Sequence, residues 1–217
     1  MLVGERMTHP VITVRADAPI MDAYELMQKE KIRRLPVVDK KGALVGIVSE
    51  SDVLHASPSQ ATSLSMWELN YLMSKVTVDE IMTSEVITIG VDTPLEEAAR
   101  IMADNKVGGL PVMREDKLAG IVTETDLFKV FLELFGAHEP GIRITVLVPN
   151  EPGELSKLTS AIFKAGGNIL ALGTSRGEDT STAEITLKVE DVQESDLREA
   201  LKPLVEKVVD VRSMKAI

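Results

Sequence analysis

The sequence GIVSESDV at residues 46–53 returns, almost unchanged, as GIVTETDL at residues 120–127. Each copy is an apolar run that ends in a hydroxyl residue, Ser49 or Thr123, and an aspartate follows three positions later. The apolar run predicts a buried strand, and the apolar residues after the aspartate predict a helix. The chain therefore contains the same strand–helix junction twice.

The repeat extends towards the N-terminus of each copy. Met7-Thr8 matches Met82-Thr83, and LPV at 35–37 matches LPV at 110–112, both at an offset of 75 residues. The offset falls to 74 in the turn before Gly120, where one residue is missing. A register kept over this length indicates one supersecondary unit used twice.

Each repeat has the pattern of a β-α-β-β-α unit. In the first repeat, short β-rich runs lie at 11–14, 35–38 and 43–49, and an amphipathic helix follows Asp17. A second helix is expected to begin near Glu50. Neither repeat has enough apolar surface to fold alone, so we expect the two to pack together.

Composition limits the classes of function. A net charge of −10 argues against a nucleic-acid partner and against an anionic membrane surface. The chain has no cysteine, which excludes disulfides and thiolate metal sites. No apolar run approaches the roughly 18 residues of a membrane span, and residues 1–6 lack the pattern of a signal peptide. We therefore expect a cytoplasmic protein.

The chain also lacks the motifs of common catalytic sites. Its three histidines are scattered, without zinc-binding spacing, so no metal site is expected. No nucleophile elbow, Walker loop or dinucleotide-binding glycine motif occurs. The sequence therefore favours a protein that is not an enzyme.

A different pattern begins after Pro140-Gly141. Residues 142–148 alternate as a half-buried strand does, and Gly166-Gly167 ends an amphipathic helix. The expected order is β-α-β-β-α-β, a ferredoxin-like arrangement with elements at 142–148, 155–165, 169–174, 182–189, 195–206 and 208–211. Between the two repeats, a polar segment precedes a short helix at Leu64–Met73, whose Trp67 and Tyr71 we expect in a core or a subunit contact.

The hydroxyl-x-x-Asp phrase has two compatible interpretations. The aspartate could close a capping box at the helix start. It could equally bind the hydroxyls of a ribose, as carboxylates commonly do, while the hydroxyl and the first helical turn suit a phosphate. Arg33 and Arg34 likewise form either a solvated surface or a cationic site for phosphate.

These motifs carry two family resemblances. Residues 1–135 resemble a tandem pair of CBS domains, the Bateman module, in the Met-Thr opening, the Leu-Pro-Val strand and Gly-x-x-(Ser/Thr)-x-x-Asp, each present twice. Residues 142–213 resemble an ACT domain in the turn 150–155 and in Gly167-Asn168-Ile169, although this turn more often begins with aspartate than with Asn150. The domain order is similar to that of the acetoin-utilisation (AcuB) family. The resemblance implies an α+β chain with CBS domain 1 at 1–56, a linker with a short helix at 57–77, CBS domain 2 at 78–135, a linker at 136–141 and an ACT domain at 142–217.

The CBS resemblance implies two clefts, each built from both repeats, and an adenine nucleotide as regulatory ligand. One cleft combines Thr13, Arg33, Arg34, Thr123 and Asp126, with Pro36 also expected among the nucleotide-binding residues. The other combines Thr88, Gly108, Gly109, Ser49 and Asp52. The first cleft is thus expected to hold the cations, and the second to offer room without charge.

The ACT resemblance implies a ligand site or a subunit interface, formed by Asn150, Pro152, Gly153, Leu155, Asn168 and Ile169. Together the resemblances imply a ligand-sensing regulatory homodimer that acts on an unknown protein. It would bind an adenosine-containing small molecule (AMP, ATP, S-adenosylmethionine, NAD or a cyclic dinucleotide) and, in the ACT domain, an amino acid. A nucleotide-using enzyme and a ligand-free assembly scaffold stay open as alternatives.

Overall fold

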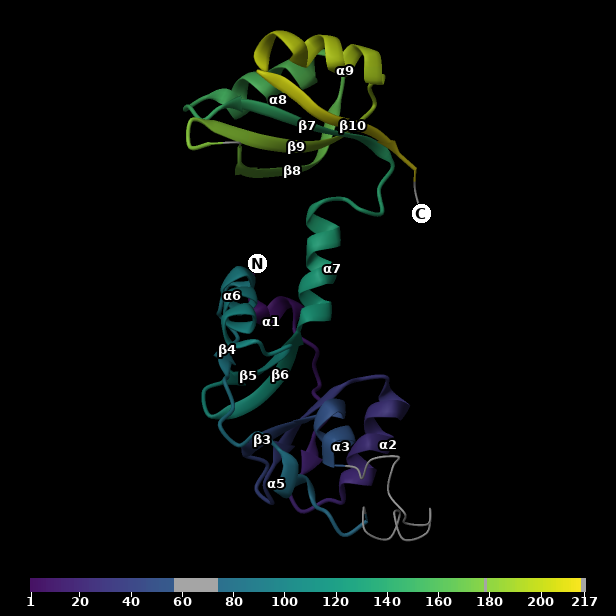
Figure 1. Cartoon of the computed structure of the whole chain (residues 1–217), viewed down its shortest axis with the longest axis vertical. Coiled ribbons are helices and arrows are strands. Elements are labelled where there is room, and N and C mark those ends of the chain that lie inside the picture. The colour runs from purple at the N-terminus through teal and green to yellow at the C-terminus, as the bar shows by residue number, and fades with distance from the viewer. Residues whose placement is uncertain (57–73, 178, 216–217) are drawn as a thin grey trace. The chain divides into compact units, whose positions relative to one another are not determined.

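The structure, a computed structural model, describes residues 1–56, 74–177 and 179–215. The chain divides into two compact units, residues 1–127 and 128–217 (Figure 1). The helix expected at Leu64–Met73, with Trp67 and Tyr71, lies outside the described residues.

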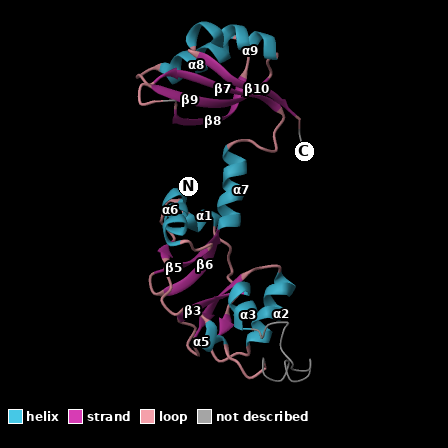
Figure 2. Ribbon diagram, in the orientation of Figure 1, coloured by secondary structure: helices cyan, strands magenta, loops and turns pink. Residues whose placement is uncertain are grey.

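The first unit contains the two β-α-β-β-α repeats, each with a three-stranded sheet, up to residue 127 in the last helix (Figure 2). In each sheet the first two strands are parallel and the last two antiparallel. The first repeat comprises β1 (Val14–Arg15), α2 (Ile20–Glu30), β2 (Arg34–Val38), β3 (Leu44–Ser49) and α3 (Glu50–Ala56). The second comprises β4 (Ile89–Gly90), α6 (Leu95–Asn105), β5 (Gly109–Arg114), β6 (Lys117–Thr123) and α7 (Glu124–Leu134).

The repeats differ from the expected pattern in their first strand. Residues 11–14 predicted a four-residue strand, but β1 is only Val14–Arg15 because only these residues pair with Val37 and Val38. The first helices follow the pattern closely. Helix α2 buries Ile20, Ala23 and Met27, and α6 buries the equivalent Leu95, Ala98 and Met102.

The opening segment of each repeat packs against the other repeat. Helix α1 (Val3–Arg6) donates from the Val3 N–H to the Thr93 carbonyl at 2.9 Å, and Thr8 bridges to Ile121 of β6. Helix α5 (Val78–Ile81) completes the core of the first repeat, because Val78 is fully buried there. The repeats thus exchange their N-terminal segments and are tied together by backbone hydrogen bonds.

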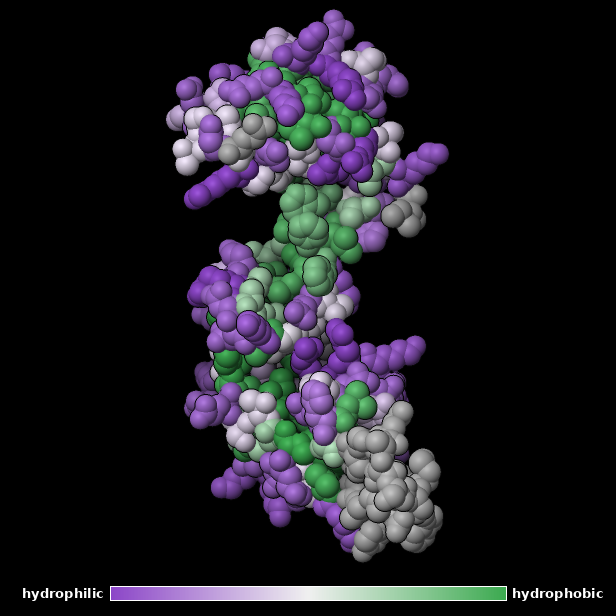
Figure 3. Space-filling view, in the orientation of Figure 1, coloured by the Kyte–Doolittle hydropathy of each residue, from purple (hydrophilic) through white to green (hydrophobic). Residues whose placement is uncertain are grey.

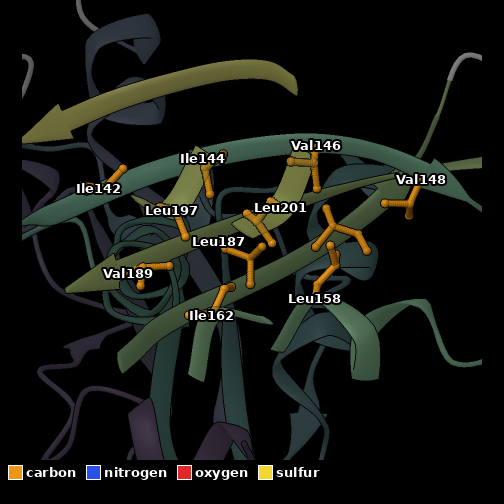
Figure 4. Close-up of a cluster of buried hydrophobic side chains, with 11 residues drawn as sticks. Ile142, Ile144, Val146, Val148, Leu158, Ile162, Leu187, Val189, Leu197 and Leu201 are labelled. Carbon is orange, nitrogen blue, oxygen red and sulfur yellow. The ribbon is translucent and has the colours of Figure 1, made fainter. Parts of the chain in front are cut away.

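The second unit confirms the ferredoxin-like arrangement. Its antiparallel sheet has the order β10-β7-β9-β8, and two helices cover one face (Figures 1 and 2). Between that face and the helices lies a core of eleven buried residues (Figure 4). The elements are β7 (Gly141–Pro149), α8 (Glu154–Lys164), β8 (Asn168–Arg176), β9 (Thr182–Glu190), α9 (Glu194–Leu201) and β10 (Lys207–Met214).

Helix α9 ends earlier than the apolar pattern predicted. The sequence placed its end near Glu206, but the chain turns into a 3₁₀ segment at Lys202–Leu204. Pro203 explains the change, because proline lacks the N–H that an α-helix interior requires.

Candidate functional site

Both hydroxyl-x-x-Asp phrases are closed by bonds to the aspartate, and at Ser49 the Asp52 N–H also donates back to Oγ at 3.3 Å, which completes a capping box. Strand β3 ends at Ser49, and the Oδ2 atom of Asp52 accepts hydrogen bonds from the Ser49 N–H and Oγ, both at 2.7 Å. At the start of α7, Oδ2 of Asp126 accepts the same two bonds from Thr123, at 3.0 and 2.8 Å. The structure therefore shows the capping interpretation of this motif. The bonds from the hydroxyl residue use the Oδ2 atom of each aspartate.

A pocket of about 230 Å³ lies between the repeats, at the capping box of Ser49. Ser49 and Asp52 line it from the first repeat, and Gly108 and Gly109 from the second. These four residues were expected together in the second cleft. Thr88 was expected with them but does not line the pocket. It is exposed, next to the lining residues Val86 and Ile87. The remaining lining residues are Arg34, Ile47, Thr83, Glu85, Val86, Ile87, Lys106, Val107 and Leu110.

Arg34 corrects the assignment of charge to the clefts. It lies directly opposite Ser49 in the β2–β3 ladder, and opposite residues of an antiparallel pair share a face of the sheet. Its guanidinium reaches Gly108, where an added Cβ would lie 2.7 Å from Cζ. The prediction that the second cleft lacks charge is wrong, because Arg34 and Lys106 both line it.

Of the residues expected in the first cleft, all within the described ranges, only Thr123 and Asp126 are bonded to each other. Arg33 is exposed and Thr13 half-buried. In the part of the chain that the structure describes, no hydrogen bond joins Thr13 or Arg33 to that pair. Pro36 is buried in β2, opposite Ile47.

Sequence reasoning missed Lys106, although the repeat held the signal. Lys31 and Lys106 stand at the same offset of 75 residues, and each ends its helix in the left-handed conformation, with φ of 55° and 56°. A positive φ at a lysine is uncommon. It sets the direction in which the chain leaves the helix towards the cleft.

The ACT domain carries a second pocket, of about 680 Å³. Four of the six predicted residues line it, namely Asn150, Pro152 and Gly153 from the turn between β7 and α8, and Leu155 from the first turn of α8. Gly153 has a φ of 98°, which only glycine adopts easily. Arg176 and Asp179, which the sequence did not single out as site residues, also line the pocket.

Hydrogen bonds of Asn150 and Asp179 fix the loop that lines part of this pocket. Asn150 donates from its backbone N–H to the Ser181 carbonyl at 2.7 Å, and from Nδ2 to the Thr180 carbonyl at 3.2 Å. Asp179 accepts from the Ser181 hydroxyl and backbone N–H, and these bonds lower the pKa of Asp179 below its ordinary value. Asn150 thus serves to fix the β8–β9 loop.

The other two predicted ACT residues lie outside this pocket, so for them the second expected role, a subunit interface, stays a prediction. Asn168 pairs with Glu190 in the ladder and donates from Nδ2 to its Oε1 at 2.7 Å; Ile169 follows it. The pocket meets β8 at Thr174, six residues further on. At about 3.3 Å per strand residue, the two ends lie roughly 20 Å apart.

Among the described residues, no cluster of histidine, cysteine, aspartate or glutamate side chains could hold a metal ion. In that same part of the chain, every helix is too short or too polar to cross a membrane.

Family models match most of the chain. The CBS domain model matches residues 3–59 and 78–133, and the ACT domain model matches residues 142–206. The chain spans only 23% and 32% of the length of the first two curated relatives that it matches. One of these is the L-aspartate semialdehyde sulfurtransferase of Methanocaldococcus jannaschii, 33% identical over 131 residues, or 60% of this chain.

Solved CBS structures resemble the chain. The CBS domain pair of protein MJ0100, in complex with 5′-methylthioadenosine and S-adenosyl-L-methionine, is 33% identical with a TM-score of 0.51, and the match covers 60% of this chain and 95% of that one. CBSX2 in complex with AMP, a protein of Arabidopsis thaliana, is 32% identical with a TM-score of 0.52, over 61% and 97%.

A protein of Vibrio cholerae assigned to acetoin utilization (AcuB) is also similar. It is 32% identical with a TM-score of 0.52, over 64% of this chain and 98% of that one. The prediction of two CBS repeats and a C-terminal ACT domain is confirmed by the family matches. The chain belongs to the CBS domain family, as a tandem CBS pair followed by an ACT domain.

Proposed function

We propose that this protein is a regulatory sensor that binds an adenine nucleotide between its two CBS repeats. The observation that carries the proposal is the pocket at the repeat junction, where Ser49 and Asp52 of one repeat face Gly108 and Gly109 of the other. A ligand there touches both repeats at once, so its binding energy depends on their arrangement.

The Asp52 carboxylate supports a ribose contact. Oδ2 is taken by the two bonds from Ser49, while Oδ1 accepts no hydrogen bond from the described residues. Asp52 is half-buried, and a half-buried acceptor gains from a hydroxyl donor. Relatives with bound AMP, 5′-methylthioadenosine and S-adenosyl-L-methionine support an adenosine ligand, since a ribose is common to all three.

The ACT domain has two roles in this proposal. It supplies contacts for a homodimer, and its pocket at the 150–155 turn takes an amino acid. Ligands in either domain would shift the populations of conformers, which an unknown partner protein reads. The proposal places the sensor in the cytoplasm, where adenine nucleotides are available to it.

The experiment that tests the proposal is a thermal-shift screen with adenosine, AMP, ATP, S-adenosyl-L-methionine and NAD, with product analysis in parallel. A sensor shows a raised Tm without turnover, because a ligand at a hundred times its Kd stabilises by about 2.7 kcal/mol. Turnover would support an enzyme instead. A Tm that no compound changes would support an assembly scaffold.

A further inference from the structure

Helix α7 starts beside the pocket proposed for the nucleotide. The N–H of Glu124, the first residue of the helix, donates to the carbonyl of Gly108 at 3.3 Å, and Gly108 lines that pocket. The Glu124 side chain lies against the same glycine, because its Oε2 atom is 2.7 Å from the position of a Cβ there. A ligand that displaces Gly108 therefore acts on the start of α7.

The end of α7 has a different origin from its start. Residues up to Val130 have counterparts in the first repeat at an offset of 74, but the apolar run FLELF at 131–135 corresponds to SPSQA at 57–61. The compact unit that contains the ACT sheet begins at Phe128, within the helix. The apolar end of α7 is therefore a feature of the second repeat alone, and it belongs structurally to the ACT domain.

Two contacts hold this end of α7 on the ACT sheet. The Phe135 ring covers Gly173 of β8, where an added Cβ would lie 2.6 Å from Cε1 of the ring. The chain then leaves the helix at Gly136, which has a φ of 55° and is buried. The Gly136 carbonyl accepts a hydrogen bond from Nζ of Lys188 on β9 at 2.5 Å. The helix end is thus fixed to two neighbouring strands of one sheet.

Lys188 is a buried cation, only 4% exposed, that bonds to a carbonyl and not to a carboxylate. Among the described residues it forms no ion pair. The C-terminal end of a helix carries partial negative charge, which favours a cation there. A buried ammonium that loses its acceptor is costly, so the Gly136 carbonyl is either in place or replaced by water. The contact therefore has two discrete states, as an element that transmits a signal requires.

The same contact adjoins the pocket of the ACT domain. Residues 174–176, which follow Gly173 directly in β8, line that pocket. They pair with β9, the strand that carries Lys188. A change at the end of α7 therefore acts on both strands that border the ACT pocket.

We infer that α7 couples the two pockets, so that a nucleotide bound between the CBS repeats regulates the ACT pocket through Phe135 and Lys188. This rests on the proposed function and adds to it the route by which one domain controls the other. With 11 residues α7 is about 16 Å long, and a rigid helix carries a displacement from one end to the other. Bound nucleotide holds Gly108 against Glu124 and thereby keeps the Lys188 contact in place.

The test is hydrogen exchange of the full chain, measured by mass spectrometry with and without AMP or, if AMP does not raise the Tm, the adenosine compound that does. Lys188→Met removes the ammonium from a side chain of similar length, and Lys164→Met, at an exposed position of α8, is its control. Phe135→Ala removes the ring from Gly173, and Phe163→Ala, also exposed on α8, is its control. Calorimetry gives the concentration that saturates each variant, and circular dichroism shows that each is folded.

Without nucleotide, Lys188→Met should exchange the amides of residues 135–137 about ten- to a hundredfold faster than the wild type, because a charge-assisted bond is lost. Saturating nucleotide should slow exchange at residues 174–176 in the wild type and in both controls. In Lys188→Met and Phe135→Ala this effect should be lost, although both variants still bind the nucleotide.

A wild type that binds nucleotide without slower exchange at residues 174–176 would overturn the coupling and leave the sensor intact. An undiminished effect of nucleotide in Lys188→Met and Phe135→Ala would do the same. If no adenosine compound binds the wild type, the proposed function fails and the coupling with it, while exchange at residues 135–137 still shows whether Lys188 holds the helix end.

Discussion

The sulfur of Met7, in the first repeat, packs against Gly120 in the second, only 2.5 Å from the position that a Cβ there would take. Met82 of the second repeat packs in the same way against Gly46 of the first. The four residues stand at matching places in the sequence repeat. The repeated Met-Thr and Gly-Ile-Val motifs thus form one contact, made twice across the CBS pair.

Gly120→Ala should destabilise the CBS pair more than Gly46→Ala. At Gly120 an added Cβ also lies 2.9 Å from the Thr8 carbonyl oxygen, and Thr8 is fixed by its backbone bonds to Ile121. At Gly46 the nearest atoms all belong to the flexible Met82 side chain. We expect a loss of about 1–3 kcal/mol for Gly120→Ala, measured by urea unfolding. An equal or larger loss for Gly46→Ala would mean that the methionine, and not the Thr8 backbone, limits the fit.

The repeat explains how much of the fold the sequence could predict. Helix α2 follows the 3–4 spacing of Ile20, Ala23 and Met27, and these residues are buried as expected. The ACT topology followed from runs of alternating apolar residues, which predicted strands, and from Gly166-Gly167, which predicted the end of a helix. The apolar pattern predicts α9 too long because it continues past Pro203, where the α-helix gives way to a 3₁₀ segment.

The site was harder to predict than the fold. Register places Arg34 opposite Ser49, but the direction of a long side chain depends on space in the other repeat, here the absence of a side chain at Gly109. Asn168 was grouped with Asn150 by family motif, although the length of β8 separates them. Both points concern distance in space, which spacing along the chain does not determine.

The turn between β2 and β3 should make stability depend on pH. Oδ1 of Asp39 accepts bonds from the N–H groups of Lys41 and Ala43, each at 2.8 Å, and these bonds, first that of Ala43, lower the pKa of Asp39. A carboxyl whose pKa is lower in the folded state stabilises fully above the ordinary aspartate pKa of about 3.9, and this contribution is lost as the pH falls through the folded pKa.

Asp39→Asn should therefore flatten the acid side of the stability curve, because an amide oxygen accepts the same bonds without titrating. Urea midpoints between about pH 7 and about pH 3 bracket the ordinary aspartate pKa and measure this. Asp116→Asn, in the corresponding turn of the second repeat, is the control, since its side chain is exposed. If Asp39→Asn and wild type lose stability in parallel, the turn has no part in the pH dependence.

We expect a homodimer, with the apolar surface of α7 at its interface. Phe128, Phe131 and Leu134 are 68%, 55% and 54% exposed, and apolar side chains gather along this helix (Figure 3). Exposed apolar groups of this size usually mark an interaction surface. Light scattering should give twice the chain mass of 23.6 kDa.

Phe128→Glu should shift the dimer towards monomer, because burying an unpaired carboxylate is costly. Phe163→Glu is the matched control, since Phe163 is 80% exposed on α8. A wild-type mass near 24 kDa at micromolar concentration would contradict the dimer. Equal effects of the two variants would place the interface elsewhere.

Gly153→Ala should abolish amino-acid binding by the ACT domain and leave AMP binding intact. Gly153 lines the pocket with a φ of 98°, and a Cβ there meets no described atom within 4 Å, so it would enter the pocket space. Gly166, with a φ of 84° and equally open surroundings, lies at the end of α8 and serves as the matched control. Each alanine should cost about 1–2 kcal/mol of stability, because each forces a side chain into the left-handed backbone region. Calorimetry of both variants with the common amino acids therefore separates the pocket from the strain, since only Gly153→Ala should lose binding.

If both variants lose amino-acid binding, strain alone is the cause. If the wild type binds none, the ACT domain is a dimerisation module without an amino-acid ligand.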